Sequence, residues 1–467
     1  MNGNYKYLFK NIGVLTISNF TSKILTFLLV PLYTNILTPE EYGTYDFYVV
    51  TALLLIPLLS ANIVEAILRF LLDKSIHPKD VFSIGLRFEL LAIVLCSIII
   101  SINYKLELIE MLNDYPIIFV IYFSAILFSD FMNQFARGMD KIKDVAVAGV
   151  INSITHIGLN ILFLVYLKLG LCGFFYASIY SLIISGIYLF IKLKGWQYIQ
   201  FFRIDGFLCK EMLAYSSPLI ASNLSGWVNN LSSRFILVWL CGASINGVFS
   251  AATKIPAVLL VFQTIFTQAW TLSAVKSLGE KNSEFYKSVY QNYNFWIVLL
   301  CSLIILLDKP FSAILFGKAF YEAWKFAPFL LISVVFSSLT GFLIGVFSAY
   351  KRSKEIAVTM TIGAVINCVL CALLIHLIGP IGAAIASVLS YLCIWILQVH
   401  RISDVVNFKH YMFHDSFSYL ILLVQAVALL FIKNDVILYC LELFCLFMII
   451  VSNKELIKKY YHKIRNK

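Results

Sequence analysis

Cations and amides inside apolar stretches are the residues of this sequence best suited to bind a ligand. In the stretch 12–37, Lys23 follows Asn19 by four residues, so the two side chains would share one face of a helix. A charge at the centre of a membrane helix costs about 2.5–3.5 kcal/mol on insertion scales and normally faces the protein interior or a water-filled cavity. We therefore expect Lys23 to line such a cavity.

A second polar stripe lies in the stretch 214–240. Asn223, Asn230 and Arg234 are separated by seven and four residues, which again places them on one helical face. The stretches 12–37 and 214–240 head the two copies of an internal repeat. In a two-fold arrangement their polar faces could meet across a central cavity.

The next apolar stretch, 248–273, adds Lys254 and Gln268, which are fourteen residues apart and so lie near one face. Three cations and several amides around one cavity would bind an anionic ligand such as a phosphate or a pyrophosphate. An alternative is that Arg234 and Lys254, in the outer third of their stretches, extend to the membrane surface. Pro31, Pro57 and Pro256, in the first, second and eighth stretches, predict bends near the cavity, either static kinks or hinges.

Two acidic residues, Glu65 and Asp130, are candidates for carrying a coupling proton. Glu65 precedes Arg69 by four residues, a spacing that favours an ion pair along one helix over a coupling role. Asp130 shares a helical face with Gln134 and Arg137 and could form a local pair in the same way. The sequence leaves both alternatives open.

No other pattern indicates catalytic chemistry. Cys368 and Cys371 have the spacing of a metal or redox pair, but the sequence provides no second pair and no histidine cluster beside them. A Walker A loop is also absent, so ATP is not expected as the direct energy source. We expect neither a cofactor nor a bound metal ion, and no enzymatic activity.

The composition predicts a membrane protein. Of 467 residues, 61% are hydrophobic and 13% are charged, about half the charged fraction of ~25% that is usual in globular domains. Apolar runs long enough to cross ~30 Å of hydrocarbon recur along the chain, whereas a barrel would show alternating segments of about ten residues. We predict an all-α polytopic membrane protein with about 14 transmembrane helices. They lie near 12–37, 44–68, 88–102, 116–134, 145–167, 172–191, 214–240, 248–273, 293–307, 326–349, 357–378, 382–399, 416–432 and 436–452.

If both termini lie in the cytoplasm, most of the basic residues lie on the cytoplasmic side of the membrane. The cytoplasmic segments then hold 27 of the 36 Lys and Arg residues and the outer loops hold six, as the positive-inside rule requires. The net charge of +11 is therefore mainly a topology signal, with the basic tail 454–467 resting on anionic membrane lipids. Because the basic residues are spread over many short loops, nucleic-acid binding is not predicted.

An internal repeat divides the chain. The matching segments are 18–43 with 222–247, 143–147 with 354–358, and 170–178 with 379–387, at offsets of 204, 211 and 209. Each copy holds six spans, so both begin on the same side of the membrane and the repeats are parallel. The predicted domains are an N-terminal six-helix lobe (1–191), a cytoplasmic linker (192–213), a C-terminal six-helix lobe (214–400) and an additional helix pair with a basic tail (401–467).

The segment 30–45, Val-Pro-Leu-Tyr-Thr-Asn-Ile-Leu-Thr-Pro-Glu-Glu-Tyr-Gly-Thr-Tyr, resembles the end of the first helix and the first outer loop of the polysaccharide flippase family. The segments 250–255 and 379–387 resemble the same family. The resemblance covers about residues 10–400. Lipid II flippases and multidrug-and-toxin extruders belong to the same superfamily.

The resemblance implies a V-shaped core of two six-helix lobes that alternates between inward-open and outward-open states. The substrate would be an undecaprenyl-pyrophosphate-linked oligosaccharide, an O-antigen or capsule repeat unit, moved from the cytoplasmic to the outer leaflet of the bacterial inner membrane. Lys23, Arg234 and Lys254 stand at places comparable to the basic cavity residues of the family. A polysaccharide polymerase and a chain-length regulator are further partners that the resemblance implies.

Three competing functions follow from other features of the sequence. A lipid II-type flippase would also accept an anionic carrier lipid, and the sequence separates it poorly from a polysaccharide flippase. A multidrug extruder handles cationic drugs and would favour an acidic cavity, against which the basic stripe argues. An O-antigen polymerase or ligase would resemble its relatives in having a large extracytoplasmic loop, and no outer loop here is large.

Overall fold

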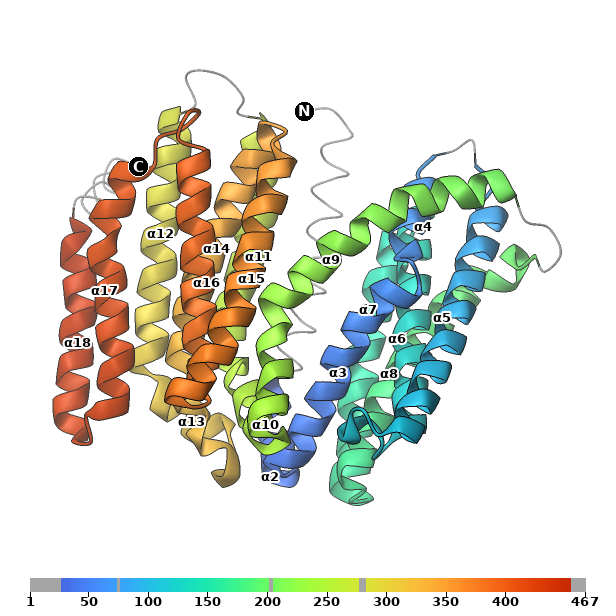
Figure 1. Cartoon of the computed structure of the whole chain (residues 1–467), viewed down its shortest axis with the longest axis horizontal. Helices are drawn as coiled ribbons and strands as arrows, with labels where there is room; N and C mark the ends of the chain where they lie inside the picture. The colour runs from blue at the N-terminus through green and yellow to red at the C-terminus, as the bar shows by residue number, and fades with distance from the viewer. Residues whose placement is uncertain (1–26, 74–75, 201–204, 277–282, 455–467) are drawn as a thin grey trace. The chain divides into compact units, whose positions relative to one another are not determined.

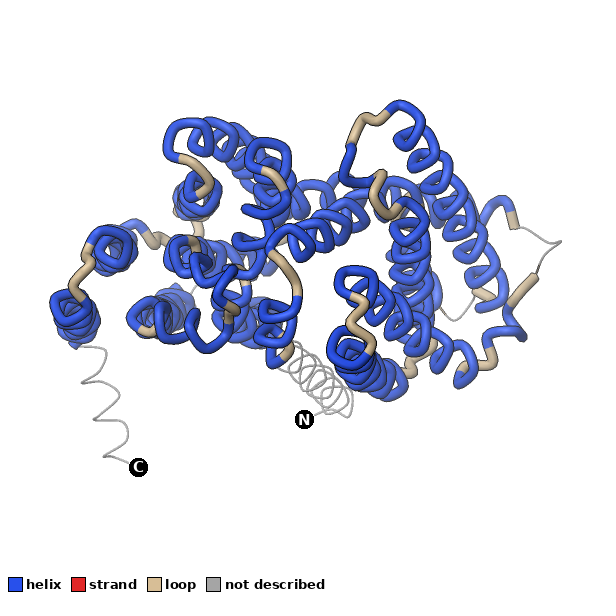
Figure 2. The backbone as a smooth tube through the Cα atoms, turned by 90° about the horizontal axis from the view of Figure 1, so that it is seen from below, coloured by secondary structure: helices blue, strands red, loops and turns tan. Residues whose placement is uncertain are grey.

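The computed structural model describes residues 27–73, 76–200, 205–276 and 283–454. Within these ranges the regular secondary structure is helical throughout, and no strand is formed (Figure 2). The chain divides into two compact units, Met1–Trp227 and Val228–Lys467. The division falls inside helix α9, Gly206–Cys241, which therefore contributes to both units. The domain boundaries expected from the sequence stay a prediction.

The first unit contains helices α2 to α8 and the beginning of α9 (Figure 1). Their bounds are Val30–Ile36 (α2), Pro39–Leu59 (α3), Ile63–Leu71 (α4), Pro78–Leu106 (α5), Pro116–Gly138 (α6), Ile142–Asn160 (α7) and Gly170–Lys192 (α8), with a π-helical turn, Ile161–Tyr166, after α7. The core joins α4, α5 and α6 through Phe82, Phe131 and Phe135. The ring of Phe82 packs edge-on against the other two, with centroid distances of 4.9 and 4.8 Å.

The segment 30–45 contains the start of α3, and three of its residues stabilise that helix end. Thr38 precedes the helix, and its side chain accepts a hydrogen bond of 3.2 Å from the backbone N–H of Glu41. The carboxylate of Glu41 accepts one of 2.8 Å from the backbone N–H of Thr38 in return, which completes a capping box. Pro39 occupies the first helical position, where no N–H is needed.

The second unit contains the rest of α9 and helices α10 to α18 (Figure 1). Their bounds are Ala243–Ala252 (α10), Lys254–Lys276 (α11), Ser283–Leu306 (α12), Asp308–Leu315 (α13), Ala327–Ala349 (α14), Ser353–Ile378 (α15), Ile381–Arg401 (α16), Lys409–Phe431 (α17) and Asp435–Ser452 (α18). A 3₁₀ segment, Lys318–Lys325, precedes α14. Helix α14 forms the centre of the unit, because 83% of its most apolar window is buried. Helices α11, α12, α15, α16 and α17 contact it.

Ten described helices are long and apolar enough to cross a membrane, and the bent pair Ala243–Ala252 and Lys254–Thr267 raises the number to 11. The predicted all-helical polytopic membrane protein is confirmed at this level. Three of the 14 predicted spans are not counted for separate reasons. The first begins outside the described residues, α9 carries too many polar side chains, and the described apolar part of α17, Asp415–Phe431, is shorter than a full span.

Structural features recur at the offsets found in the sequence. Helix α10 begins at Ala243, 204 residues after α3 begins at Pro39. Asp140 and Lys351, which are 211 residues apart, both adopt a left-handed backbone with φ of 58°. The residue after each of them donates its backbone N–H, over 2.9 Å, to a carbonyl five positions earlier. Two helices therefore end in the same way, at corresponding places in the two units.

Candidate functional site

The predicted binding residues are only partly within the described structure. Asn19 and Lys23 lie outside the described residues. The side chain of Gln268 also lies outside the description, although its backbone belongs to α11. Asn223, Asn230, Arg234 and Lys254 can be placed, and the site is built from them.

The structure brings Arg234 of α9 to the junction between α10 and α11. The Nη2 of Arg234 donates a hydrogen bond of 3.4 Å to the Oγ1 of Thr253, the residue that follows α10. Lys254 is the next residue and the first of α11. Both cationic side chains are half-buried. Two of the predicted binding residues thus lie at one junction, which is the strongest concentration of positive charge among the predicted residues that the structure describes.

Pro256 explains why a junction exists here at all. A proline lacks the N–H that a helix needs, and its ring collides with the carbonyl four residues before it. That residue is Ala252, where α10 ends. The two helices meet at an angle of 44°. Broken helices of this kind form binding sites in many secondary transporters, because they expose polar backbone inside the membrane.

The polar face of α9 is held in place by the neighbouring helices of the second unit. Asn230 lies one turn before Arg234, and its Oδ1 accepts a hydrogen bond of 2.7 Å from the hydroxyl of Tyr391 on α16. Asn229 donates to the backbone carbonyl of Met360 on α15 over 3.0 Å. These contacts fix the rotation of α9 about its axis, and with it the direction in which Arg234 extends.

Asn223 belongs to the first unit. Its Nδ2 donates a hydrogen bond of 3.0 Å to the Oδ1 of Asn62, the residue before α4. One turn later, the indole Nε1 of Trp227 donates to the carbonyl of Val50 over 2.9 Å. The middle of α9 is therefore attached by side-chain hydrogen bonds to α3 and to the residue before α4, and Asn223 has a structural partner that sequence spacing did not reveal.

A buried polar cluster in the second unit was not predicted. Asn367 of α15 is fully buried, and its Oδ1 accepts hydrogen bonds of 3.2 Å from both Ser232 and Ser233 of α9. The signal in the sequence is a single asparagine in the middle of the apolar stretch 357–378. Polar residues at such places commonly join membrane helices.

The candidate coupling acids lie together in the first unit. Asp130 of α6 interacts electrostatically with Glu65 of α4 and with Arg137, which lies two turns further along α6. A third acid, Glu89 of α5, lies near the end of the predicted span 88–102, where the sequence predicts a solvated side chain. That expectation is wrong, because Glu89 is 4% exposed, interacts with Asp130 and has no hydrogen-bond partner on either carboxylate oxygen. The alternative ion pair between Glu65 and Arg69 is absent, although both residues are described.

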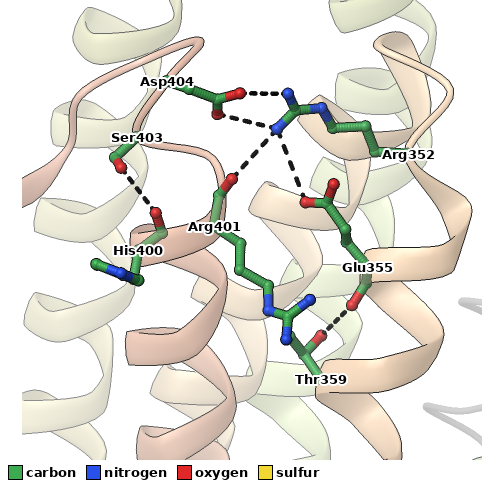
Figure 3. A network of polar contacts seen from close by, with 7 residues as sticks. All are labelled: Arg352, Glu355, Thr359, His400, Arg401, Ser403 and Asp404. Carbon is green, nitrogen blue, oxygen red and sulfur yellow. Dashed lines mark hydrogen bonds and ion pairs between the residues drawn. The ribbon is translucent and has the colours of Figure 1, made fainter.

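An ionic network joins two loops of the second unit (Figure 3). Arg352, between α14 and α15, extends across to Asp404, between α16 and α17, and binds its carboxylate through both terminal nitrogens. The same guanidinium donates to the carbonyl of Arg401 over 3.2 Å and lies 3.7 Å from Glu355. The Arg352 guanidinium lowers the pKa of Asp404 below its usual value. This network braces the ends of the helices and lies outside the predicted site.

Solved transporter structures share this fold. The lipid II flippase MurJ, in an inward closed conformation, aligns with a TM-score of 0.72 at 16% identity, covering 94% of this chain and 99% of that one. An inward-facing MATE-family multidrug resistance transporter of the MOP superfamily aligns with a TM-score of 0.66 at 17% identity, covering 82% and 95%. This chain therefore has the same helical fold as these two solved structures.

The sequence also matches a protein family. The family described as polysaccharide biosynthesis protein matches residues 8–271, more than half of the chain, and the chain belongs to that family. The family membership expected from the segment 30–45 is thus confirmed. The capsular polysaccharide biosynthesis protein CapF of Staphylococcus aureus is 22% identical over 325 residues, which are 67% of this chain and 78% of CapF.

Proposed function

We propose that this protein translocates an undecaprenyl-pyrophosphate-linked oligosaccharide, an O-antigen or capsule repeat unit, from the cytoplasmic to the outer leaflet by alternating access. The observation that carries the proposal is the junction of α10 and α11, where Arg234 contacts Thr253 beside Lys254. Two half-buried cations at a helix break would bind a pyrophosphate through charge-assisted hydrogen bonds.

The physical reason lies in the two halves of such a substrate. A pyrophosphate with its sugars is strongly hydrated and cannot cross hydrocarbon, whereas the polyprenyl chain can stay among the lipid tails. Polar and cationic side chains inside the membrane would replace the lost hydration of the head group. Lys23, Asn19, Asn223, Asn230 and Gln268 are proposed as further parts of this lining.

The proposed topology has 14 spans, of which 12 form two parallel six-helix repeats, and places both termini in the cytoplasm. Its support is the common start of α3 and α10 at an offset of 204 residues, together with the excess of basic residues in the segments assigned to the cytoplasm. Glu65 and Asp130 are proposed as carriers of a coupling proton. A polysaccharide polymerase and a chain-length regulator are proposed as partners in the same membrane.

A lipid II-type flippase is the second candidate function. The likeness to MurJ favours it, since that alignment covers nearly all of both chains with the higher of the two TM-scores quoted. The family match and the relative CapF favour a polysaccharide unit instead. Transport of cationic drugs is disfavoured, because the described junction is basic.

The test is head-group transfer in vesicles that contain the purified protein and an undecaprenyl-pyrophosphate-linked oligosaccharide, with lipid II in a parallel set. We expect faster transfer of the oligosaccharide than in empty vesicles. Arg234→Ala and Lys254→Ala should each reduce the rate at least tenfold. Lys433→Ala, which removes an exposed cation between α17 and α18, is the matched control and should leave the rate unchanged.

Three outcomes decide between the candidates. Faster transfer of lipid II than of the oligosaccharide would favour the second candidate. Folded protein that moves neither lipid, with or without a pH gradient, would overturn the proposal. If transfer persists in both cation variants, the protein is a flippase but the junction of α10 and α11 is not its head-group site.

A further inference from the structure

Two buried acids lie where the C-terminal helix pair, α17 and α18, packs against α12. Asp308 is the first residue of α13, directly after α12, and Glu442 lies two turns into α18. Both side chains are completely buried, at 0% exposure. They are close enough to interact electrostatically. Neither acid belongs to the lining proposed for translocation.

The hydrogen bonds of this group are incomplete. Gln425 of α17 points at Glu442 and donates its Nε2 to one carboxylate oxygen over 2.7 Å. The other oxygen of Glu442, the Oε1 of Gln425 and both carboxylate oxygens of Asp308 have no partner. Ser312, one turn after Asp308, is equally buried with an unpartnered hydroxyl. Four unpartnered acceptor oxygens thus lie in one buried group whose amide donor is already used.

The charges nearby do not neutralise the two acids. Lys309, beside Asp308, lies 3.8 Å from the exposed carboxylate of Asp435 and 5.1 Å from the ring centre of Trp324. The other titratable groups that interact with the two acids are Tyr439, which interacts with both, and Cys445, which interacts with Glu442. Burial raises the pKa of Asp308 well above its usual value, and the carboxylate of Glu442 raises it further, against the opposing effect of Lys309.

Two buried carboxylates cannot both stay charged at low cost. Removing each from water costs several kcal/mol when no cation pairs with it, and the repulsion between two like charges adds to this. A proton removes one charge and adds an O–H donor to a group in which the Ser312 hydroxyl is the one unpartnered donor against four unpartnered acceptors. The described residues hold no group of three or more His, Cys, Asp and Glu side chains that could bind a metal ion. Two carboxylates with unpartnered acceptor oxygens therefore suit a single proton.

We propose that Asp308 and Glu442 form a buried carboxyl pair that binds one exchangeable proton. The pair lies at the contact of α17 and α18 with α12 and α13, so its protonation controls how firmly the C-terminal helix pair is held. Loss of the proton at alkaline pH leaves two negative charges in that contact and loosens it.

The proposal is tested on the full chain in lipid nanodiscs with dicyclohexylcarbodiimide, a reagent that attacks protonated carboxyl groups in apolar surroundings. Labelled peptides are identified by mass spectrometry across a range of pH. We expect label on Asp308 or Glu442 that falls as the pH rises. In Glu442→Gln, labelling of Asp308 should be lost at a lower pH, because the neighbouring carboxylate no longer raises the pKa of Asp308. Glu322→Gln removes an exposed acid of the 3₁₀ segment and should not move the profile.

Several results would contradict the proton pair. Folded wild-type protein that takes up no label at either position at any pH would overturn it, and this measurement needs no variant. A labelling profile of Asp308 that is identical in wild type and in Glu442→Gln would show that the two acids are not coupled. If sodium chloride, but not choline chloride, protects the two acids from labelling at constant pH, the bound ion is sodium and the proton proposal is wrong.

Discussion

Pro256 lies four residues after Ala252, the residue at which α10 ends, and this relationship sets the position of the helix junction. At the corresponding place in the first unit, 204 residues earlier, the sequence has Ala52, and α3 runs unbroken from Pro39 to Leu59. At this pair of positions the broken helix has proline and the unbroken helix has alanine, which keeps the backbone N–H that proline lacks. A proline elsewhere in a helix does not suffice, since α3 contains Pro57 near its end and is unbroken.

Pro256→Ala should join α10 and α11 into a straighter helix. Removing a proline from a helix interior relieves a penalty of ~3 kcal/mol, so the thermal stability should be unchanged or higher. The transfer rate should nevertheless fall several-fold, because Lys254 would turn away from Arg234. The measurement is head-group transfer beside a melting curve. Pro57→Ala, a proline inside the unbroken α3, is the control. A transfer rate equal to that of wild type would show that the break is not required.

Thr253→Val should weaken substrate binding without unfolding the protein. Valine has the same shape but lacks the hydroxyl that accepts the hydrogen bond from Arg234 and donates one of 2.7 Å to Ser250. Losing a hydrogen bond to a charged group costs about 1.5–3 kcal/mol, or roughly ten- to hundredfold in affinity if the guanidinium is needed in this position. The concentration of lipid-linked oligosaccharide that half-saturates transfer should rise, and Thr253→Ser should restore it. Equal values in all three proteins would exclude a positioning role for Thr253.

The sequence was most informative where a local pattern determines local structure. The offset of 204 placed the starts of α3 and α10 at corresponding residues, and the motif around Thr38 and Glu41 is a capping box that can be recognised from spacing alone. Pro256 predicted a bend, although its angle and the choice between kink and hinge were not readable.

Contacts between residues far apart in the chain could not be predicted from the sequence. The partners of Asn367, seen only once α9 and α15 are packed, are separated from it by more than 130 residues. Asp308 and Glu442 are also more than 130 residues apart, and they interact only because α18 packs beside α12. Periodicity identifies which face of a helix is polar, but it does not identify what that face meets.

Gly382→Ala should destabilise the second unit. Gly382 of α16 lies so close to α15 that an added Cβ would be 2.4 Å from the carbonyl carbon and 2.5 Å from the carbonyl oxygen of Leu374. Backbone atoms cannot rotate away, so overpacking should cost about 1–3 kcal/mol. Gly158→Ala in α7 is the matched control, because nothing lies within 4 Å of its added Cβ. That variant should gain up to about 1 kcal/mol from helix propensity. Melting temperatures in detergent should therefore move in opposite directions, and a stable Gly382→Ala would contradict the close packing.

Asp404→Asn tests the network of Arg352 through its dependence on pH and salt. The guanidinium lowers the pKa of Asp404 in the folded protein, so the ion pair stabilises it above the unfolded pKa and loses that effect as the pH falls through the folded pKa. Because the pair is largely exposed, the loss at neutral pH should not exceed about 1 kcal/mol, and added salt should reduce it. Melting curves of wild type and Asp404→Asn should differ at neutral pH and converge in acid. Glu322→Gln, which breaks the exposed pair with Lys325 within one short segment, should change the melting temperature less, since it joins no separate loops. A difference that grows as the pH falls would have the wrong sign for a carboxylate held in its charged form by Arg352.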